Sequence, residues 1–176
     1  RSMVTTYRMT RLAALGSVLW LATNARGESI IGKAVLIKDG KEQPLPDAVI
    51  SIEGVEGSFR PLATPARLDQ RNKVFVPHVL PLLRGATVEF FNSDPVFHNV
   101  HSKSATKAFN VGQKKKGDVS RVTFDKLGLV DVRCHIHTQM QAWIVVLPNP
   151  YFAASNSRGL FKLVAPVGTH TVKVKC

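Results

Sequence analysis

The chain has 176 residues, of which 44% are hydrophobic and 20% are charged. This composition supports one packed domain or two small ones, and it excludes an intrinsically disordered chain, which would be much less hydrophobic. The formal net charge of +12 favours an acidic binding partner. It does not indicate nucleic-acid binding, because no platform of interleaved aromatic and basic side chains accompanies it.

The N-terminal segment predicts export from the cytoplasm. Arg8 and Arg11 precede an apolar run at 12–22, and small side chains follow up to Ala25. A basic start, a short apolar core and a small-residue end are the three parts of a secretory signal peptide, here residues 1–25. An uncleaved N-terminal anchor and an ordinary apolar helix are the alternatives.

Export would make this a bacterial, periplasmic protein. After cleavage no membrane span is expected, because no other segment approaches the ~20 apolar residues that a spanning helix needs. Cleavage removes three of the 24 basic residues and none of the 12 acidic ones, so the net charge becomes about +9.

The rest of the chain is predicted to form short strands separated by turns. Apolar and polar residues alternate within short runs, and Gly or Pro residues interrupt them, as at Asp39-Gly40. Residues 59–72 show no period and are expected to be a linker. No long segment has a helical period, so the pattern predicts an all-β sandwich. The predicted strands are, in chain order, 30–37, 48–54, 73–80, 87–92, 96–101, 118–125, 129–134, 142–147, 160–164 and 169–175.

Two of these strands carry candidate metal ligands at inward-facing positions. Side chains on a strand alternate between its two faces, so Cys134 shares a face with Val130 and Val132. By the same rule His98 lies inward and His101 points outward. We therefore expect His98 and Cys134 at the rim of the core.

The loop that follows Cys134 contains two more candidate ligands, His137 and Met140, before the strand at 142–147. With His98, the set is one thiolate, two imidazoles and one thioether. Two histidines and a cysteine with a weak axial methionine form the ligand set of mononuclear copper electron-transfer sites. We predict a single copper ion held by His98, Cys134, His137 and Met140. Zinc is disfavoured, because Met is a poor zinc ligand and no second pair of ligands lies at zinc-finger spacing.

These ligand segments resemble those of the cupredoxins. The spacing Cys-x2-His-x2-Met, with an Asp-x3-His-Asn strand whose histidine lies 36 residues before the cysteine, is similar to that of plastocyanin-like and especially amicyanin-like blue copper proteins. Bacterial cupredoxin-like proteins of methylamine utilisation have a similar Phe-His-Asn-Val segment and Cys-x-Ile-His-x2-Met loop. The resemblance covers residues 74–146. His135 and Thr138 depart from the pattern, and neither change removes a ligand.

The resemblance implies a cupredoxin-like Greek-key β-sandwich at 72–148 with one type 1 copper ion. It further implies that Asn99 ties the two ligand segments together by hydrogen bonding. The expected function is transfer of single electrons between redox partners, such as an acidic dehydrogenase or a cytochrome. Enzymatic activity is not expected, because four protein ligands leave no open position for a substrate. The sequence does not define the oligomeric state.

The outer segments resemble carboxypeptidase regulatory-like β-sandwiches, on the Gly-x-Phe motif at 159–161 and the Pro-x-Gly-Thr motif at 166–169. That resemblance implies a discontinuous β frame, 28–60 with 151–176, into which the copper module is inserted. The alternative is one enlarged cupredoxin whose extra strands decorate one end.

Several alternatives accompany the copper hypothesis. The chain has two cysteines, so a Cys134–Cys176 disulfide is one of them, although the dense ligand spacing around Cys134 does not favour it. A copper carrier or storage protein would use the same four ligands. A non-redox β-sandwich binding or adhesion module would have incidental histidines. The basic run Lys114–Lys116 is expected to be a solvated turn or a surface that steers an acidic partner.

Overall fold

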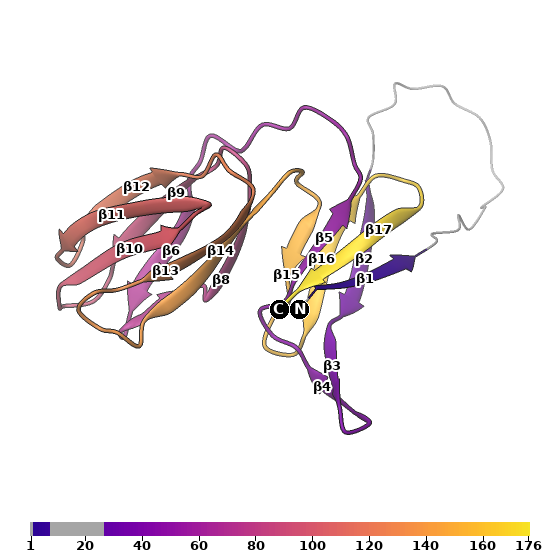
Figure 1. The fold of residues 1–176 in the computed structure, drawn as a ribbon, viewed down its shortest axis with the longest axis horizontal. Helices are drawn as coiled ribbons and strands as arrows, with labels where there is room; N and C mark the ends of the chain where they lie inside the picture. Colours follow the sequence, from indigo (N-terminus) through magenta and orange to yellow (C-terminus); the bar gives the residue numbers. More distant parts are fainter. Residues whose placement is uncertain (1, 8–26) are drawn as a thin grey trace, which may run out of the picture. The chain divides into compact units, whose positions relative to one another are not determined.

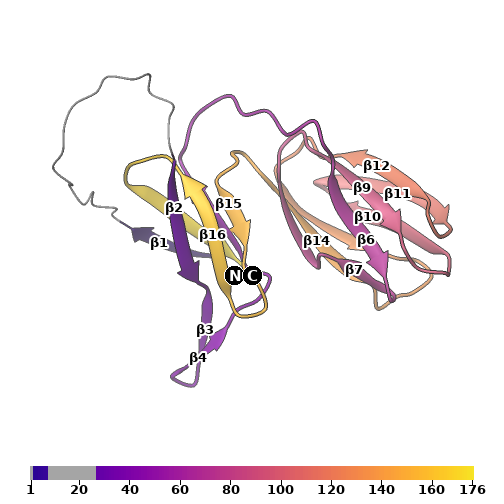
Figure 2. The same cartoon turned by 180° about the vertical axis from the view of Figure 1, so that it is seen from behind.

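The computed structural model describes residues 2–7 and 27–176. Every regular element in these two ranges is a β-strand, which confirms the predicted all-β class. Neither range contains a helix that could span a membrane. The chain divides into two compact units, which Figures 1 and 2 show from opposite sides. Unit 1 comprises Arg1–Val55 and Tyr151–Cys176, and unit 2 comprises Glu56–Pro150.

Unit 2 is a sandwich of two β-sheets, as the sequence predicts (Figure 1). One sheet has the strand order β11-β10-β13-β14-β8 and the other β12-β9-β6-β7. Strands β14 and β8 are parallel, as are β6 and β9, and the other paired strands are antiparallel. The strands are β6 (Ala66–Arg71), β7 (Val74–Val76), β8 (Val79–Leu83), β9 (Thr87–Asn92), β10 (His98–Ser104), β11 (Lys107–Lys114), β12 (Val119–Thr123), β13 (Gly128–Arg133) and β14 (Gln141–Leu147).

The core of unit 2 lies between these sheets and extends to the candidate ligands. Val130 and Val132 on the central strand β13 are fully buried, as alternation predicts, and residues 144–147 of the neighbouring strand β14 are all buried. Burying one such side chain contributes about 1.5–3 kcal/mol. Cys134 and Met140 belong to the same cluster of buried residues. The ligand loop is therefore anchored in the core at both of its ends.

The linker predicted at 59–72 is wrong over its second half, where Ala66–Arg71 form β6 beside β9. Leu68, Asp69 and Gln70 are consecutive and all buried. Because two of the three are polar, the apolar alternation that identifies a strand is lost. Both polar side chains form hydrogen bonds, Asp69 with Ser93 and Gln70 with the Phe91 carbonyl. These bonds allow their burial.

Unit 1 is built from both ends of the chain. Its largest sheet has the order β1-β17-β5-β15, and β16 pairs with β2 and β3 with β4. It has its own core, formed by Ala34, Ala48, Ile50, Ile52, Leu163, Ala165 and Val172. The strands are β1 (Ser2–Tyr7), β2 (Glu28–Lys33), β3 (Val35–Lys38), β4 (Lys41–Pro44), β5 (Val49–Glu53), β15 (Phe152–Ala154), β16 (Leu160–Ala165) and β17 (His170–Lys175).

Two predictions about the outer parts of the chain stay predictions. The domains expected from the sequence are 28–60 with 151–176, and 72–148, and the likeness of the outer frame to carboxypeptidase regulatory-like domains is untested. Of the expected signal peptide 1–25, Ser2–Tyr7 form β1 against β17. Residues 8–25 lie outside the described residues.

Candidate metal centre

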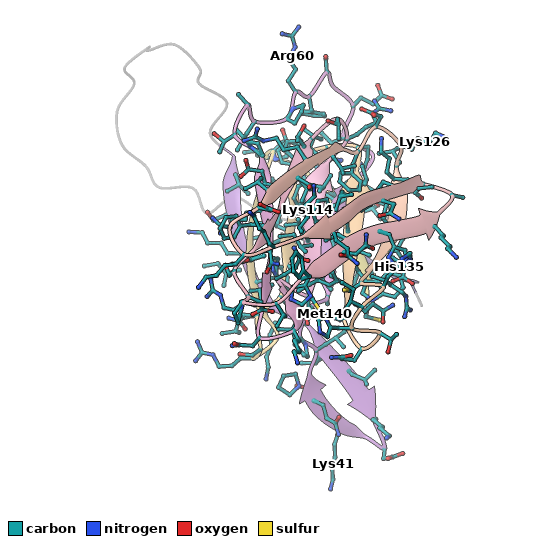
Figure 3. All side chains as sticks on the ribbon, turned by 90° about the vertical axis from the view of Figure 1, so that its left-hand side faces the viewer. Lys41, Arg60, Lys114, Lys126, His135 and Met140 are labelled. Carbon is teal, nitrogen blue, oxygen red and sulfur yellow. The ribbon has the colours of Figure 1, made fainter. Side chains whose placement is uncertain are left out.

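The Cys134–Met140 loop connects two adjacent antiparallel strands of unit 2. Cys134 directly follows β13, and β14 begins at Gln141, so the loop leaves and re-enters one sheet. Two backbone hydrogen bonds close it, from the Cys134 amide to the Met140 carbonyl at 3.4 Å and from the Met140 amide to the His137 carbonyl at 3.0 Å. Within unit 2, Figure 3 shows Met140 and His135 on the side away from Arg60 and Lys126.

Three of the four predicted ligands converge at the Cys134–Met140 loop. His98, the first residue of β10, is 0% exposed, and its Nδ1 lies 3.8 Å from Cys134 Sγ and 3.1 Å from His137 Nδ1. All three candidate ligand atoms lie within 4.8 Å of one another. Two ligand atoms about 2.0–2.3 Å from one ion can lie up to about 4.6 Å apart. The two distances from His98 Nδ1 are well within this limit and the 4.8 Å bound on all three pairs is close to it, so a small adjustment would bring the three atoms onto a single metal ion. Met140, in the same loop, is 1% exposed.

His98 is fixed by a carboxylate on the side of the ring away from the cluster. Its Nε2 lies 2.7 Å from Asp94 Oδ2, and both side chains are buried. The Asp94 carboxylate also accepts the backbone amides of Asn72 at 2.5 Å and Lys73 at 2.8 Å. Burial raises the pKa of Asp94, but hydrogen bonds from the two amides and from His98 outweigh it, so the pKa lies below its usual value. An ionised Asp94 accepts a hydrogen bond from Nε2–H, and this tautomer leaves Nδ1 as the ligand atom.

His137 lies in a more exposed position than His98 or Cys134 and is half-buried. Burial lowers the pKa of His137, and electrostatic interactions with His98 and Lys73 lower it further, which outweighs the opposite effect of Asp94. The neutral imidazole is the form that binds metals. The surroundings of His137 therefore favour its ligand form.

Asn92 shapes the segment that leads to His98. Its Nδ2 donates to the carbonyls of Val96 and Lys114, each at 2.9 Å, and its Oδ1 accepts the Asp94 amide at 2.9 Å. The side chain is fully buried and all its polar atoms are used. Asn92 thus bends the chain between β9 and β10 so that Asp94 faces His98.

The predicted role of Asn99 is wrong. Its Nδ2 donates to Asn110 Oδ1 on β11 at 2.7 Å, and its buried Oδ1 has no hydrogen-bond partner among the described residues. Asn99 therefore ties β10 to β11 rather than to the Cys134 loop. The residues that organise the site are instead Asn92 and Asp94. The only sequence signal for the role of Asp94 is its Asp-x3-His spacing to His98.

The other histidines lie outside the three-ligand cluster. His101 is half-buried, and its ring packs on that of exposed His135 with 3.6 Å between centroids. His78 Nδ1 donates to the Gln141 carbonyl, and His170 Nε2 donates to the Pro166 carbonyl. Cys134 and Cys176 are not joined by a disulfide.

Comparison with known proteins gives structural similarities only. No protein-family model matches the chain, and neither does any curated protein. A purple cupredoxin from Nitrosopumilus maritimus is 23% identical with a TM-score of 0.43, over 47% of this chain and 99% of that one. A mutant of amicyanin in its reduced Cu(I) form at pH 4 is 24% identical with a TM-score of 0.45, over 56% and 98%.

A copper-containing nitrite reductase from Thermus scotoductus is 26% identical with a TM-score of 0.46, over 51% of this chain and 26% of that one. All three TM-scores are below 0.5. The assignment of a function therefore depends on this chain's own cluster of one thiol and two imidazoles at the margin of the unit 2 core.

Proposed function

We propose that this chain is a type 1 copper protein that carries single electrons between redox partners. The observation that carries the proposal is the convergence of His98 Nδ1, Cys134 Sγ and His137 Nδ1 within 4.8 Å of one another. Two imidazoles and a thiolate, with Met140 as a weak fourth ligand, suit copper through a one-electron cycle better than they suit zinc.

The protein residues supply a ligand set that changes little between oxidation states. When bound, copper provides the one-electron couple. His98, Cys134 and Met140 are buried, and hydrogen bonds close the Cys134–Met140 loop, which carries three of the four proposed ligands. Such a closed site holds the ion away from water and offers no position for a substrate. It therefore favours electron transfer over catalysis.

Electrons would enter and leave near His137, because it is the most exposed of the three clustered ligands. The residues that precede the two histidine ligands in the chain, Phe97 and Ile136, are exposed apolar side chains, at 56% and 42%. A short-lived complex with a redox partner can form over such side chains. The net charge, +12 for the whole chain and about +9 after signal-peptide cleavage, favours an acidic partner and a rate of association that falls with ionic strength. Export to a bacterial periplasm belongs to the same proposal.

Visible spectroscopy of the copper-loaded protein tests this function. We expect an intense thiolate-to-copper absorption in the oxidised protein, reversible one-electron voltammetry, and complete loss of the colour in Cys134→Ser. Cys176→Ser is the matched control, because this second cysteine is exposed and belongs to unit 1, so its loss should leave the spectrum unchanged. A Cys134→Ser variant that kept the wild-type spectrum would refute the ligand assignment.

Copper exchange separates electron carriage from copper delivery or storage. A site whose thiol and one imidazole are buried should release copper slowly to an external chelator. Rapid and complete transfer would instead support a carrier or storage protein. A wild-type protein that bound no copper in either oxidation state would leave the non-redox binding module as the function.

A further inference from the structure

The carboxylate of Asp94 lies buried beside the proposed metal ligand His98, and backbone amides of a neighbouring turn bind it. Asp94 is 5% exposed and His98 0%. Asp94 receives three hydrogen bonds in total, from the His98 ring and from two successive backbone amides. A buried carboxylate costs free energy unless such partners compensate for lost water. The three hydrogen bonds replace the water that the Asp94 carboxylate loses on burial next to His98.

The two amides belong to the tight turn between β6 and β7. Arg71 pairs with Val74, so Asn72 and Lys73 are the two central residues of a β-hairpin. Both have positive φ values, 54° and 57°, as a type I′ turn requires. In this conformation successive N–H groups point the same way and form an anion-binding hollow. The anion that fills it is the Asp94 carboxylate.

We propose that Asp94, clamped by the Asn72–Lys73 turn, is the positioning residue of the metal centre and sets its preference for the oxidised ion. This inference rests on the proposed copper function and extends it. Two physical effects carry it. The hydrogen bond from Nε2 fixes the tautomer in which Nδ1 of His98 is free to bind, and it raises the basicity of that nitrogen. The fixed negative charge stabilises a doubly charged ion more than a singly charged one.

A purely structural role for Asp94 is the competing explanation. In that case the carboxylate would only tie the β6–β7 turn to the segment between β9 and β10, and its loss would lower stability without changing the metal. The two roles are separable, because one acts on the electronic properties of His98 and the other does not. The decisive measurements are therefore the reduction potential and the position of the ring proton.

Asp94→Asn removes the charge and keeps the shape of the side chain. We expect this variant to keep the visible absorption while its preference for Cu(I) over Cu(II) rises about tenfold, a shift of the potential by about +59 mV. Asp69→Asn is the matched control. Asp69 is a buried carboxylate of the same unit, but its partners are Ser93 and Arg71 rather than a histidine. Its replacement should move the potential much less. Equal potentials for Asp94→Asn and the wild type would overturn the proposal.

A second readout does not depend on bound copper. In the metal-free protein at pH 8, nitrogen-15 NMR should show His98 with its proton on Nε2, and Asp94→Ala should lose that single tautomer. A wild-type His98 protonated on Nδ1 would contradict the inference even if the protein is blue. A colourless wild type with the Nε2 tautomer would instead overturn the copper function and leave the positioning of His98 intact.

Discussion

His98 and His137 both place Nδ1 in the cluster with Cys134 Sγ, but the two side chains are held in different ways. His98 is buried between the core and the Asp94 carboxylate, so its ring has one orientation. His137 lies in a loop and is half-buried, and its Nδ1 lies 3.1 Å from His98 Nδ1. The rigid ligand therefore belongs to the strand and the accessible ligand to the loop. This division of roles suits a site that must keep its geometry and still meet a partner.

Met140 is the one proposed ligand whose role can be separated from packing by a near-isosteric change. Leu has a similar volume, so Met140→Leu in this fully buried position should cost less than about 1.5 kcal/mol of stability. We expect the variant to bind copper through the other three ligands and to have a higher reduction potential, because the axial sulfur no longer donates to the oxidised ion. Voltammetry measures the change. An unaltered potential would make Met140 a core residue only.

At the scale of elements, the β6–β7 turn stores conformational strain. Lys73 adopts a left-handed conformation with φ of 57°, which a side chain with a Cβ atom disfavours by about 1–2 kcal/mol. Lys73→Gly removes that penalty, and part of the gain is offset by the entropy of glycine in the unfolded chain. We expect a net stabilisation of about 0.5–1 kcal/mol, measured by urea unfolding of the copper-free protein.

Lys73→Ala is the control for this prediction, since it removes the same charge and keeps the Cβ atom. It should show no comparable gain. The copper potential should be the same in both variants, because each retains the backbone amide that binds Asp94 at 2.8 Å. If Lys73→Gly is no more stable than Lys73→Ala, the turn is not strained at this residue.

The strands of unit 2 differ in how far the sequence alone predicts them. Alternation of apolar and polar residues identifies β9 and β13 and places Cys134 and His98 inward, where the structure has them. It fails for β6, whose buried Asp69 and Gln70 are polar and form hydrogen bonds to Ser93, just after β9, and to the Phe91 carbonyl on β9. A strand whose buried side chains depend on such long-range hydrogen bonds shows no alternation of apolar and polar residues, so the sequence does not reveal it.

The same limit applies to the candidate site. Closely spaced ligands such as Cys134 and His137 can be recognised from their spacing, because one loop carries them both. The hydrogen bonds that hold Asp94 cannot be recognised from the sequence. Their donors are backbone amides 21 and 22 residues away, and any residue except proline has such an amide. The error over Asn99 has a related origin. Its amide meets Asn110 on a neighbouring strand, and the choice of partner depends on the register of β10 and β11.

At the scale of the whole molecule, the chain forms two units with separate hydrophobic cores. Unit 1 needs both ends of the chain, because its strand β5 pairs with β15 and β17. Unit 2 is a continuous segment and contains every proposed copper ligand. Each unit therefore has the internal contacts of an independent folding unit, and only one of them is linked to metal binding.

This separation predicts that copper stabilises one half of the protein selectively. Calorimetry should resolve two unfolding transitions, and copper should raise the melting temperature of only one of them. A ligand present at 1,000 times its dissociation constant adds about 4 kcal/mol to the unit that binds it. In Cys134→Ser, copper should shift neither transition. A single cooperative transition, or an equal shift of both, would mean that the two cores unfold as one and that the metal centre supports the entire chain.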